Sequence, residues 1–251
     1  MGDRQSLGGG SMLYVALGDS VTFGYSATRV EQSFVRRLQR FWTRPQRPVH
    51  VYLQAKPGWT SKQLLRSLAD VQDSVFAEAK VTTLMIGGND LLRGAPWLIN
   101  GNHARMLKIA EQLNDHVQQI VQHVRTLGPQ MMIATLYNPF PQSLLAVEYT
   151  QIVNRLVRRV AHRNGLLLAD VAQAFEGREQ EWIEGYRLGR MKDFRLIGNP
   201  VHPNNAGHAA IAQVFIRAWR QAHPQVQKDR RQTSKLRTRR LAPRASDAAA
   251  D

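Results

Sequence analysis

Short apolar runs alternate with longer segments of helical periodicity along most of this chain. The apolar runs lie at 12–17, 49–53, 81–86, 131–136 and 166–168. Between them, apolar side chains recur at intervals of three and four residues, which is the spacing of a helix with one buried face. Strands that alternate with helices form a parallel sheet with helices packed on both of its faces. We therefore predict an α/β protein, a three-layer α/β/α sandwich with about five parallel strands.

The helical segments follow from this spacing and from local end signals, such as Thr60 as the N-cap of the second helix. The predicted helices lie at 31–42, 60–71, 106–124, around 153–160 and at 206–219. The chain of 251 residues is long enough for one domain of this class. We place that domain at 12–224, between a flexible N-terminal segment at 1–11 and a basic tail at 225–251 that is predicted to be disordered.

Composition excludes several kinds of site. The chain has no cysteine, so disulfides, cysteine-bound zinc and thiol nucleophiles are excluded. No segment approaches the ~20 consecutive apolar residues of a membrane span, and 1–11 lacks the apolar stretch of a signal peptide. We therefore expect a soluble protein that is cytoplasmic or otherwise intracellular.

The net charge of +15 is spread over the whole chain and is dense in the tail. A tail rich in Lys and Arg can make weak contact with polyanions such as nucleic acid or anionic lipid. A solvated terminus without a partner also explains it and is the interpretation that such a charge run favours, and composition alone leaves both open.

Three polar or glycine-rich clusters follow predicted strands or precede the last helix. In an open parallel sheet, ligands bind beyond the carboxyl ends of the strands. The first cluster, Gly18-Asp19-Ser20 with Gly24 downstream, can present a serine hydroxyl on a tight turn. The cluster lacks the lysine of a phosphate-binding loop, which argues against a nucleotide site. An ordinary strand-to-helix turn would also account for these residues.

The second cluster is Gly87-Gly88-Asn89-Asp90, where the Asn89 amide can donate to a developing oxyanion. The third runs from Asn199 to Asn204 and holds His202 between two prolines. A histidine on such a loop can take a proton from a serine hydroxyl and return it to a leaving group. Taken singly, the second cluster is also explained as a turn.

Together these clusters resemble the SGNH/GDSL hydrolase family from about residue 13 to 212. The matching blocks are Gly18-Asp19-Ser20, an isolated Gly58, Gly87-Gly88-Asn89-Asp90, and His202-Pro203-Asn204 with Gly207. The resemblance implies a flavodoxin-like fold, Ser20 as nucleophile and His202 as general base and acid. It also implies an oxyanion hole formed by the backbone N–H groups of Ser20 and Gly58 and the side chain of Asn89. It implies no cofactor and no metal.

One position departs from the family pattern. The residue three before the histidine is normally aspartate, and here it is Asn199. An amide oxygen can hold the imidazole but brings no charge to stabilise the imidazolium, and in a serine protease this change costs about 10⁴-fold in kcat. We expect a Ser–His dyad oriented by Asn199 or by a backbone carbonyl, with Asp193 as an alternative if its loop folds back.

The predicted function is hydrolysis of carboxylic esters through an acyl-enzyme on Ser20. The resemblance suggests short- to medium-chain acyl esters or lysophospholipids as substrates. Two alternatives stay open: a carbohydrate O-acetyl esterase, and a non-catalytic binding or coat-associated protein on the same fold. Trp59, Trp97 and Tyr137 are either acyl-pocket or core residues, and the segment 176–193 is either a cap over the site or a surface excursion. The remaining histidines are expected to have structural roles.

Overall fold

The computed structural model describes residues 10–99, 102–194 and 200–225. Its centre is a five-stranded parallel sheet with the strand order β2-β1-β3-β4-β5. The strands are β1 (Met12–Gly18), β2 (Val49–Ala55), β3 (Ala79–Met85), β4 (Gln130–Ala134) and β5 (Leu167–Ala169). Each predicted strand is confirmed to within two residues at either end. This order is that of flavodoxin-like folds. After β2 has been added on one side of β1, the later strands are added on the other side, and a crevice opens between β1 and β3 where this change occurs.

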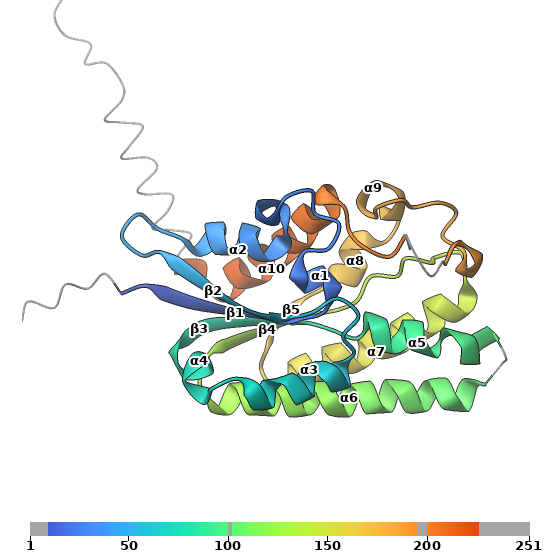
Figure 1. Cartoon of the computed structure of the whole chain (residues 1–251), viewed down its shortest axis with the longest axis horizontal. Helices are drawn as coiled ribbons and strands as arrows, with labels where there is room; N and C mark the ends of the chain where they lie inside the picture. Colours follow the sequence, from blue (N-terminus) through green and yellow to red (C-terminus); the bar gives the residue numbers. More distant parts are fainter. Residues whose placement is uncertain (1–9, 100–101, 195–199, 226–251) are drawn as a thin grey trace, which may run out of the picture.

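Helices cover both faces of the sheet, as predicted (Figure 1). One face carries α1 (Ser20–Phe23), α2 (Phe34–Trp42), α8 (Val171–Phe175), α9 (Glu179–Trp182) and α10 (Asn205–Ala222). The other carries α3 (Ser61–Ser67), α4 (Asp73–Glu78), α5 (Gly88–Ile99), α6 (His103–Thr126) and α7 (Leu144–Arg163). Three short 3₁₀ helices complete the described elements: η1 (Val30–Gln32), η2 (Leu68–Asp70) and η3 (Met191–Asp193). The three-layer α/β/α sandwich is therefore confirmed.

Two helices have other bounds than those predicted from the spacing of apolar residues. The segment 31–42 is broken at Ser33, whose backbone is extended and whose hydroxyl accepts the Arg36 N–H, so that α2 starts only at Phe34. The segment 60–71 keeps the predicted Thr60 cap, completed by Gln63 as a capping box. Its helix changes to η2 at Leu68. In the second segment the apolar spacing continues through Leu68 to Val71, which is why periodicity alone did not locate the change.

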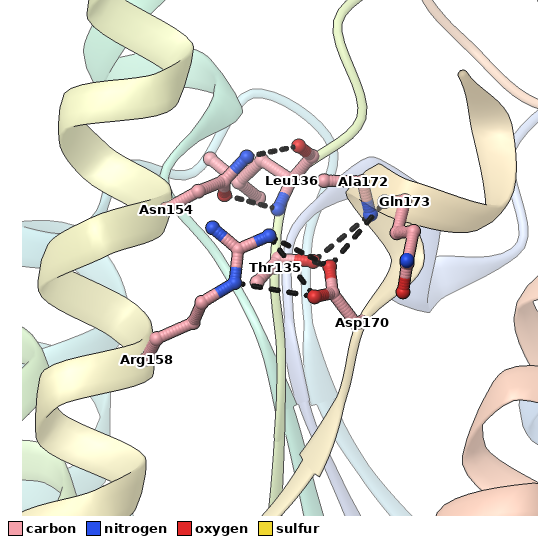
Figure 2. Close-up of polar contacts among 7 residues, drawn as sticks. All are labelled: Thr135, Leu136, Asn154, Arg158, Asp170, Ala172 and Gln173. Atoms are coloured by element: carbon pink, nitrogen blue, oxygen red, sulfur yellow. Dashed lines mark hydrogen bonds and ion pairs between the residues drawn. The ribbon is translucent and has the colours of Figure 1, made fainter. Parts of the chain in front are cut away.

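A polar cluster locks the ends of β4 and β5 beside the site (Figure 2). Arg158 on α7 donates to both carboxylate oxygens of Asp170, with Nη2–Oδ1 and Nη2–Oδ2 distances of 3.0 Å. Asp170 Oδ1 also accepts the Thr135 hydroxyl at 2.9 Å. Asn154 bridges both the N–H and the carbonyl of Leu136, at 2.7 and 2.8 Å. These bonds fix the backbone at the start of the segment 136–140, which lines a cavity beyond the end of the sheet.

The loop that carries His202 is anchored by the packing of α10 on α2. Phe34 and Phe215 stack with ring centroids 5.6 Å apart, and both are fully buried. Trp42 and Trp219 meet edge to face at 5.3 Å. Aromatic pairs of this kind add about 0.5–1.5 kcal/mol beyond the area they bury. The start of α10 is therefore a rigid support for the residues just before it.

Candidate active site

Ser20 and His202 meet at the carboxyl end of β1. The distance from Ser20 Oγ to His202 Nε2 is 3.0 Å, although the two residues lie 182 positions apart in the chain. Ser20 is the first residue of α1 and is 6% exposed. A Ser–His hydrogen bond of this length is the geometry in which imidazole can take the hydroxyl proton.

The local sequence explains why Ser20 lies on so tight a turn. A Cβ at Gly18 would collide with the Met85 carbonyl on β3, so the strand end can pack this closely only with glycine. Asp19 caps α1, because its Oδ1 accepts the Val21 N–H at 3.0 Å. Gly24 then ends the helix in the left-handed conformation, with φ of 97°. The helix is thus limited to one turn, and its first side chain faces the cavity.

His202 is held by its backbone and by a neighbouring ring. Its carbonyl accepts the Glu184 N–H at 2.9 Å, and the preceding carbonyl of Val201 accepts the Tyr137 hydroxyl at 2.6 Å. The Tyr25 ring lies against the imidazole, with centroids 4.4 Å apart. Burial lowers the pKa of His202 to about 4, so the imidazole is neutral and able to act as a base at neutral pH.

Two residues predicted to orient His202 have different outcomes. Asn199 lies outside the described residues, so its role stays a prediction. Asp193 was the alternative, and its Oδ2 accepts the N–H groups of Leu188 and Arg190, each at 3.0 Å. The Asp193 carboxylate therefore stabilises the loop 188–193 in which it lies. These contacts do not support the interpretation that Asp193 orients His202 in place of the aspartate of the family pattern.

Gly58 and Asn89 line the same cavity as Ser20, from two different loops. Gly58 has φ of 81° in a turn whose own hydrogen bond is donated by Trp59 to Lys56, at 3.2 Å. Asn89 Nδ2 donates one hydrogen to the Trp59 carbonyl at 2.9 Å. Because an amide nitrogen carries two hydrogens, this bond fixes the Asn89 side chain and leaves the second hydrogen for another acceptor.

A partly buried polar network that the sequence did not reveal joins these two loops. The Asp90 carboxylate accepts the Ser61 N–H at 2.9 Å and the Ser61 hydroxyl at 2.7 Å. His116 Nδ1 lies 2.9 Å from the same hydroxyl oxygen. Since that hydroxyl gives its single hydrogen to Asp90, His116 Nδ1 is the donor. The network ties the start of α3 to the start of α5, and only Asp90 was marked by a motif in the sequence.

The cavity beside the Ser–His pair has a volume of about 470 Å³. Its walls are largely apolar, with contributions from α1, β3, α5, α6, α7, η3 and the loops between these elements. The apolar lining includes Val21, Met85, Leu91, Leu92, Met106, Leu136, Phe140, Ala146, Met191 and Phe194. The volume lies in the range of small-molecule sites, and Ser20, Asn89 and His202 are among the polar residues that line the cavity.

The aromatic residues singled out in the sequence divide between the site and the core. Tyr137 lines the cavity and stacks on Phe175 with centroids 4.4 Å apart. Trp59 packs against the hydrophobic core, and the Trp97 side chain lies outside the described residues. The segment 176–193 contributes Met191 to the cavity wall, so part of it covers the site as one of the two interpretations expected.

The low pKa of His202 predicts an unusual pH profile. For the general base predicted at His202 the neutral imidazole is the active form, so kcat/KM is expected to rise with pH through a limb near pH 4 instead of near the ordinary value of about 6.5 for histidine. The measurement is kcat/KM for a p-nitrophenyl ester between pH 3 and 8. A limb near pH 6.5 would show that a charge at the Nδ1 side outweighs burial.

An Asn199→Asp variant tests how a negative charge at residue 199 changes the pKa of His202. A carboxylate against the imidazole favours the charged form, so the acid limb is expected to move up by about one to three pH units, and kcat to rise. Asn102→Asp, which replaces the N-cap of α6, is the matched control and is expected to leave the limb in place. An unchanged limb in Asn199→Asp would mean that residue 199 does not face His202.

Asp19 predicts a second pH effect, on stability. Burial raises its pKa to about 7, the Asp90 charge adds to the rise, and the bond from Val21 N–H opposes it. The unfolded chain loses this proton near pH 4, whereas the native state keeps it up to about pH 7. The free energy of unfolding therefore falls as the pH rises from about 4 to about 7.

An Asp19→Asn variant keeps an oxygen for the Val21 N–H but has no charge to bury. Relative to the wild type, it is expected to gain roughly 3 kcal/mol in free energy of unfolding on going from pH 4.5 to pH 8. Urea unfolding at the two pH values measures the difference. Asp115→Asn, on the exposed side of α6, is the control. Parallel pH dependence in Asp19→Asn and wild type would contradict the assignment.

No helix in the described ranges is both long and apolar enough to cross a membrane. Within those ranges, no group of three or more His, Asp or Glu side chains is placed to hold a metal ion.

Comparisons with known proteins agree with the fold and identify a family. A model of the GDSL-like lipase/acylhydrolase family matches residues 16–210. The spore germination lipase LipC of Bacillus licheniformis is 25% identical over 213 residues, covering 81% of this chain and 94% of the relative.

Solved structures show the same fold at lower identity. The lipase Lip_vut3 from a goat rumen metagenome superimposes with a TM-score of 0.71 at 24% identity, covering 82% of this chain and 97% of that one. The acetylxylan esterase Axe2 of Geobacillus stearothermophilus gives 0.61 at 18% identity, covering 82% and 93%. The family match over most of the domain shows that this chain belongs to the GDSL-like lipase/acylhydrolase family and is a carboxylic-ester hydrolase.

Proposed function

We propose that Ser20 is the nucleophile of this esterase and His202 its general base and acid. The observation that carries the proposal is the 3.0 Å contact between Ser20 Oγ and His202 Nε2 beside an apolar cavity. Ser20 Oγ attacks the ester carbonyl while its proton passes to His202 Nε2. The imidazolium then protonates the departing alkoxide, which leaves as the alcohol, and the acyl group stays on Ser20. Water, deprotonated by His202, releases the acid and restores the serine.

The oxyanion of each tetrahedral intermediate is held by three donors. They are the backbone N–H groups of Ser20 and Gly58 and the free hydrogen of the Asn89 amide. The first residue of a helix has no intrahelical acceptor for its N–H, which leaves that of Ser20 available. The hydrogen bond that closes the Gly58 turn is donated by the Trp59 N–H to the Lys56 carbonyl, so the turn does not use the Gly58 N–H. Fixed donors of this kind contribute about 3–4 kcal/mol each to the transition state.

Asn199 is the proposed orienting residue of His202, from its position three residues before the histidine. Its side-chain oxygen would accept the Nδ1–H and so select the tautomer in which Nε2 is the base. A neutral partner is consistent with the low pKa of His202, for which burial is the cause.

The substrate class that fits the cavity is a short- to medium-chain acyl ester or a lysophospholipid. Burial of each CH₂ of an acyl chain gains about 0.8 kcal/mol, or roughly fourfold in affinity. An acetyl group has no chain to fill a largely apolar space of about 470 Å³. The apolar lining therefore favours acyl chains of several carbons over carbohydrate O-acetyl groups.

A p-nitrophenyl ester series from acetate to dodecanoate tests this substrate class. We expect kcat/KM to rise by up to about fourfold per CH₂ and then level off when the cavity is full. Ala146 on α7 lines the cavity, so Ala146→Trp should abolish the gain for longer chains while hydrolysis of the acetate ester persists. Faster hydrolysis of acetylated xylo-oligosaccharides than of any longer acyl ester would favour the O-acetyl alternative.

Contact with polyanions is a separate proposal and rests on the charge of the chain alone. Eight Lys and Arg against three Asp in 228–251 favour anionic surfaces. Binding of a DNA duplex or of vesicles with anionic lipid is expected to fall steeply with salt and to disappear when 228–251 is deleted. Binding that survives the deletion would move the contact to the domain. The intracellular location expected from the sequence also stays a prediction.

A further inference from the structure

The Tyr25 ring packs directly on the imidazole of His202. The ring centroids are 4.4 Å apart and the planes meet at 44°. Tyr25 lines the same cavity as the Ser–His pair, and about half of it is exposed to solvent. An aromatic ring attracts a cation that lies within about 6 Å of its centre, so an imidazolium at this position would lie within range.

The backbone of Tyr25 is fixed on both sides. Its N–H donates to the Ser20 carbonyl at 2.9 Å. Its carbonyl lies 3.1 Å from Nε2 of His208, a fully buried residue of α10. Because the Phe34 N–H donates to His208 Nδ1, the His208 proton is on Nε2 and is donated to Tyr25. The ring of Tyr25 therefore extends from a backbone tied to both the nucleophile and α10.

His202 needs a partner for the positive charge that it gains during catalysis. Among the described residues, Ser20 and Tyr25 contact its ring, and Asp19 and Tyr137 line the same cavity. His208, in the first turns of α10, stays neutral because burial lowers its pKa to about 4. The position that normally supplies a carboxylate holds Asn199. Among the described residues, the two groups in direct contact with the ring, the Ser20 hydroxyl and the Tyr25 ring, are neutral, so stabilisation of the imidazolium by direct contact comes from neutral groups.

We propose that Tyr25 is a positioning residue for His202 that stabilises its imidazolium through the face of the ring. This role rests on the proposed function of His202 as the base, and it adds a source of stabilisation that the missing aspartate does not provide. A cation–π contact at a partly desolvated site predicts a loss of roughly three- to thirtyfold in kcat when the ring is removed. The Tyr25 hydroxyl has no part in it.

The test compares Tyr25→Leu, Tyr25→Phe and Tyr25→Trp with the wild type. Leucine keeps apolar cover over His202 but has no π system, so kcat is expected to fall roughly three- to thirtyfold with little change in KM. The acid limb of kcat/KM should move to lower pH, because the charged imidazole loses its support. Phenylalanine should behave as the wild type, and tryptophan, the best cation–π partner, should move the limb to higher pH.

The pKa of His202 measured by NMR titration separates this proposal from the proposed function, since it needs no turnover. A lower pKa in Tyr25→Leu and a higher one in Tyr25→Trp would support the cation–π role even if the assay failed. A raised pKa in Tyr25→Leu would overturn it, because the ring would then act only by excluding water. A loss in Tyr25→Phe equal to that in Tyr25→Leu would also overturn it and assign the effect to the hydroxyl. Circular dichroism checks that each variant is folded.

Discussion

Ser20→Ala is expected to reduce kcat/KM for p-nitrophenyl esters by about 10⁴-fold or more. Without the hydroxyl no acyl-enzyme can form, and only the binding site and the oxyanion donors remain to act on water. The substitution removes one oxygen at the first position of α1, and the helix cap at Asp19 is untouched. The free energy of unfolding is therefore expected to change by less than about 1 kcal/mol.

The matched control for this variant is Ser74→Ala. Ser74 is exposed on α4 and does not line the cavity. Wild-type activity in this control would exclude a general effect of replacing a serine. Equal, slow hydrolysis by wild type and Ser20→Ala would contradict the assignment and favour a non-catalytic role for this chain.

Asn89→Ala is expected to lower kcat by about 10²- to 10³-fold and to change KM little. An oxyanion donor acts on charge that develops only in the transition state, so its loss is seen in kcat. Asn89 also donates to the Trp59 carbonyl at 2.9 Å. Its removal thus frees the loop that carries Gly58, and the two effects act in the same direction.

Asn114→Ala is the control for Asn89→Ala, because Asn114 is an amide on α6 away from the active-site cavity. Kinetics with an ester of several carbons separate the two parameters. A rise in KM with kcat unchanged would show that Asn89 binds the ground state only, and the oxyanion role would be wrong.

The parallel sheet was predictable because its strands are short apolar runs between amphipathic helices. β1 shows this clearly, since Tyr14 through Leu17 are fully buried and nothing polar interrupts them. The rule that parallel strands end at one edge then placed the loops after β1 and β3 side by side. The start of α2 was missed because Glu31 and Gln32 were included in the predicted helix, although Ser33 directly precedes the first apolar residue, Phe34, as an N-cap does.

The site was predictable where motifs marked it and hidden where single side chains complete it. Ser20 and His202 were paired by the resemblance, and their 3.0 Å contact is the result. The His116 contact with Ser61 joins residues 55 positions apart, and no local pattern marks either of them. Tyr25 was hidden for the same reason, since a ring at a loop has no periodicity that points to a partner.

Covalent trapping tests the central claim, that Ser20 is the nucleophile, most directly. The full chain is treated with a fluorophosphonate, and the modified residue is identified by peptide mass spectrometry. We predict one phosphonate per chain, on Ser20, with labelling abolished in Ser20→Ala, strongly slowed in His202→Ala and unchanged in Ser74→Ala. Label on another residue, or equal labelling of the Ser20→Ala variant, would contradict the account.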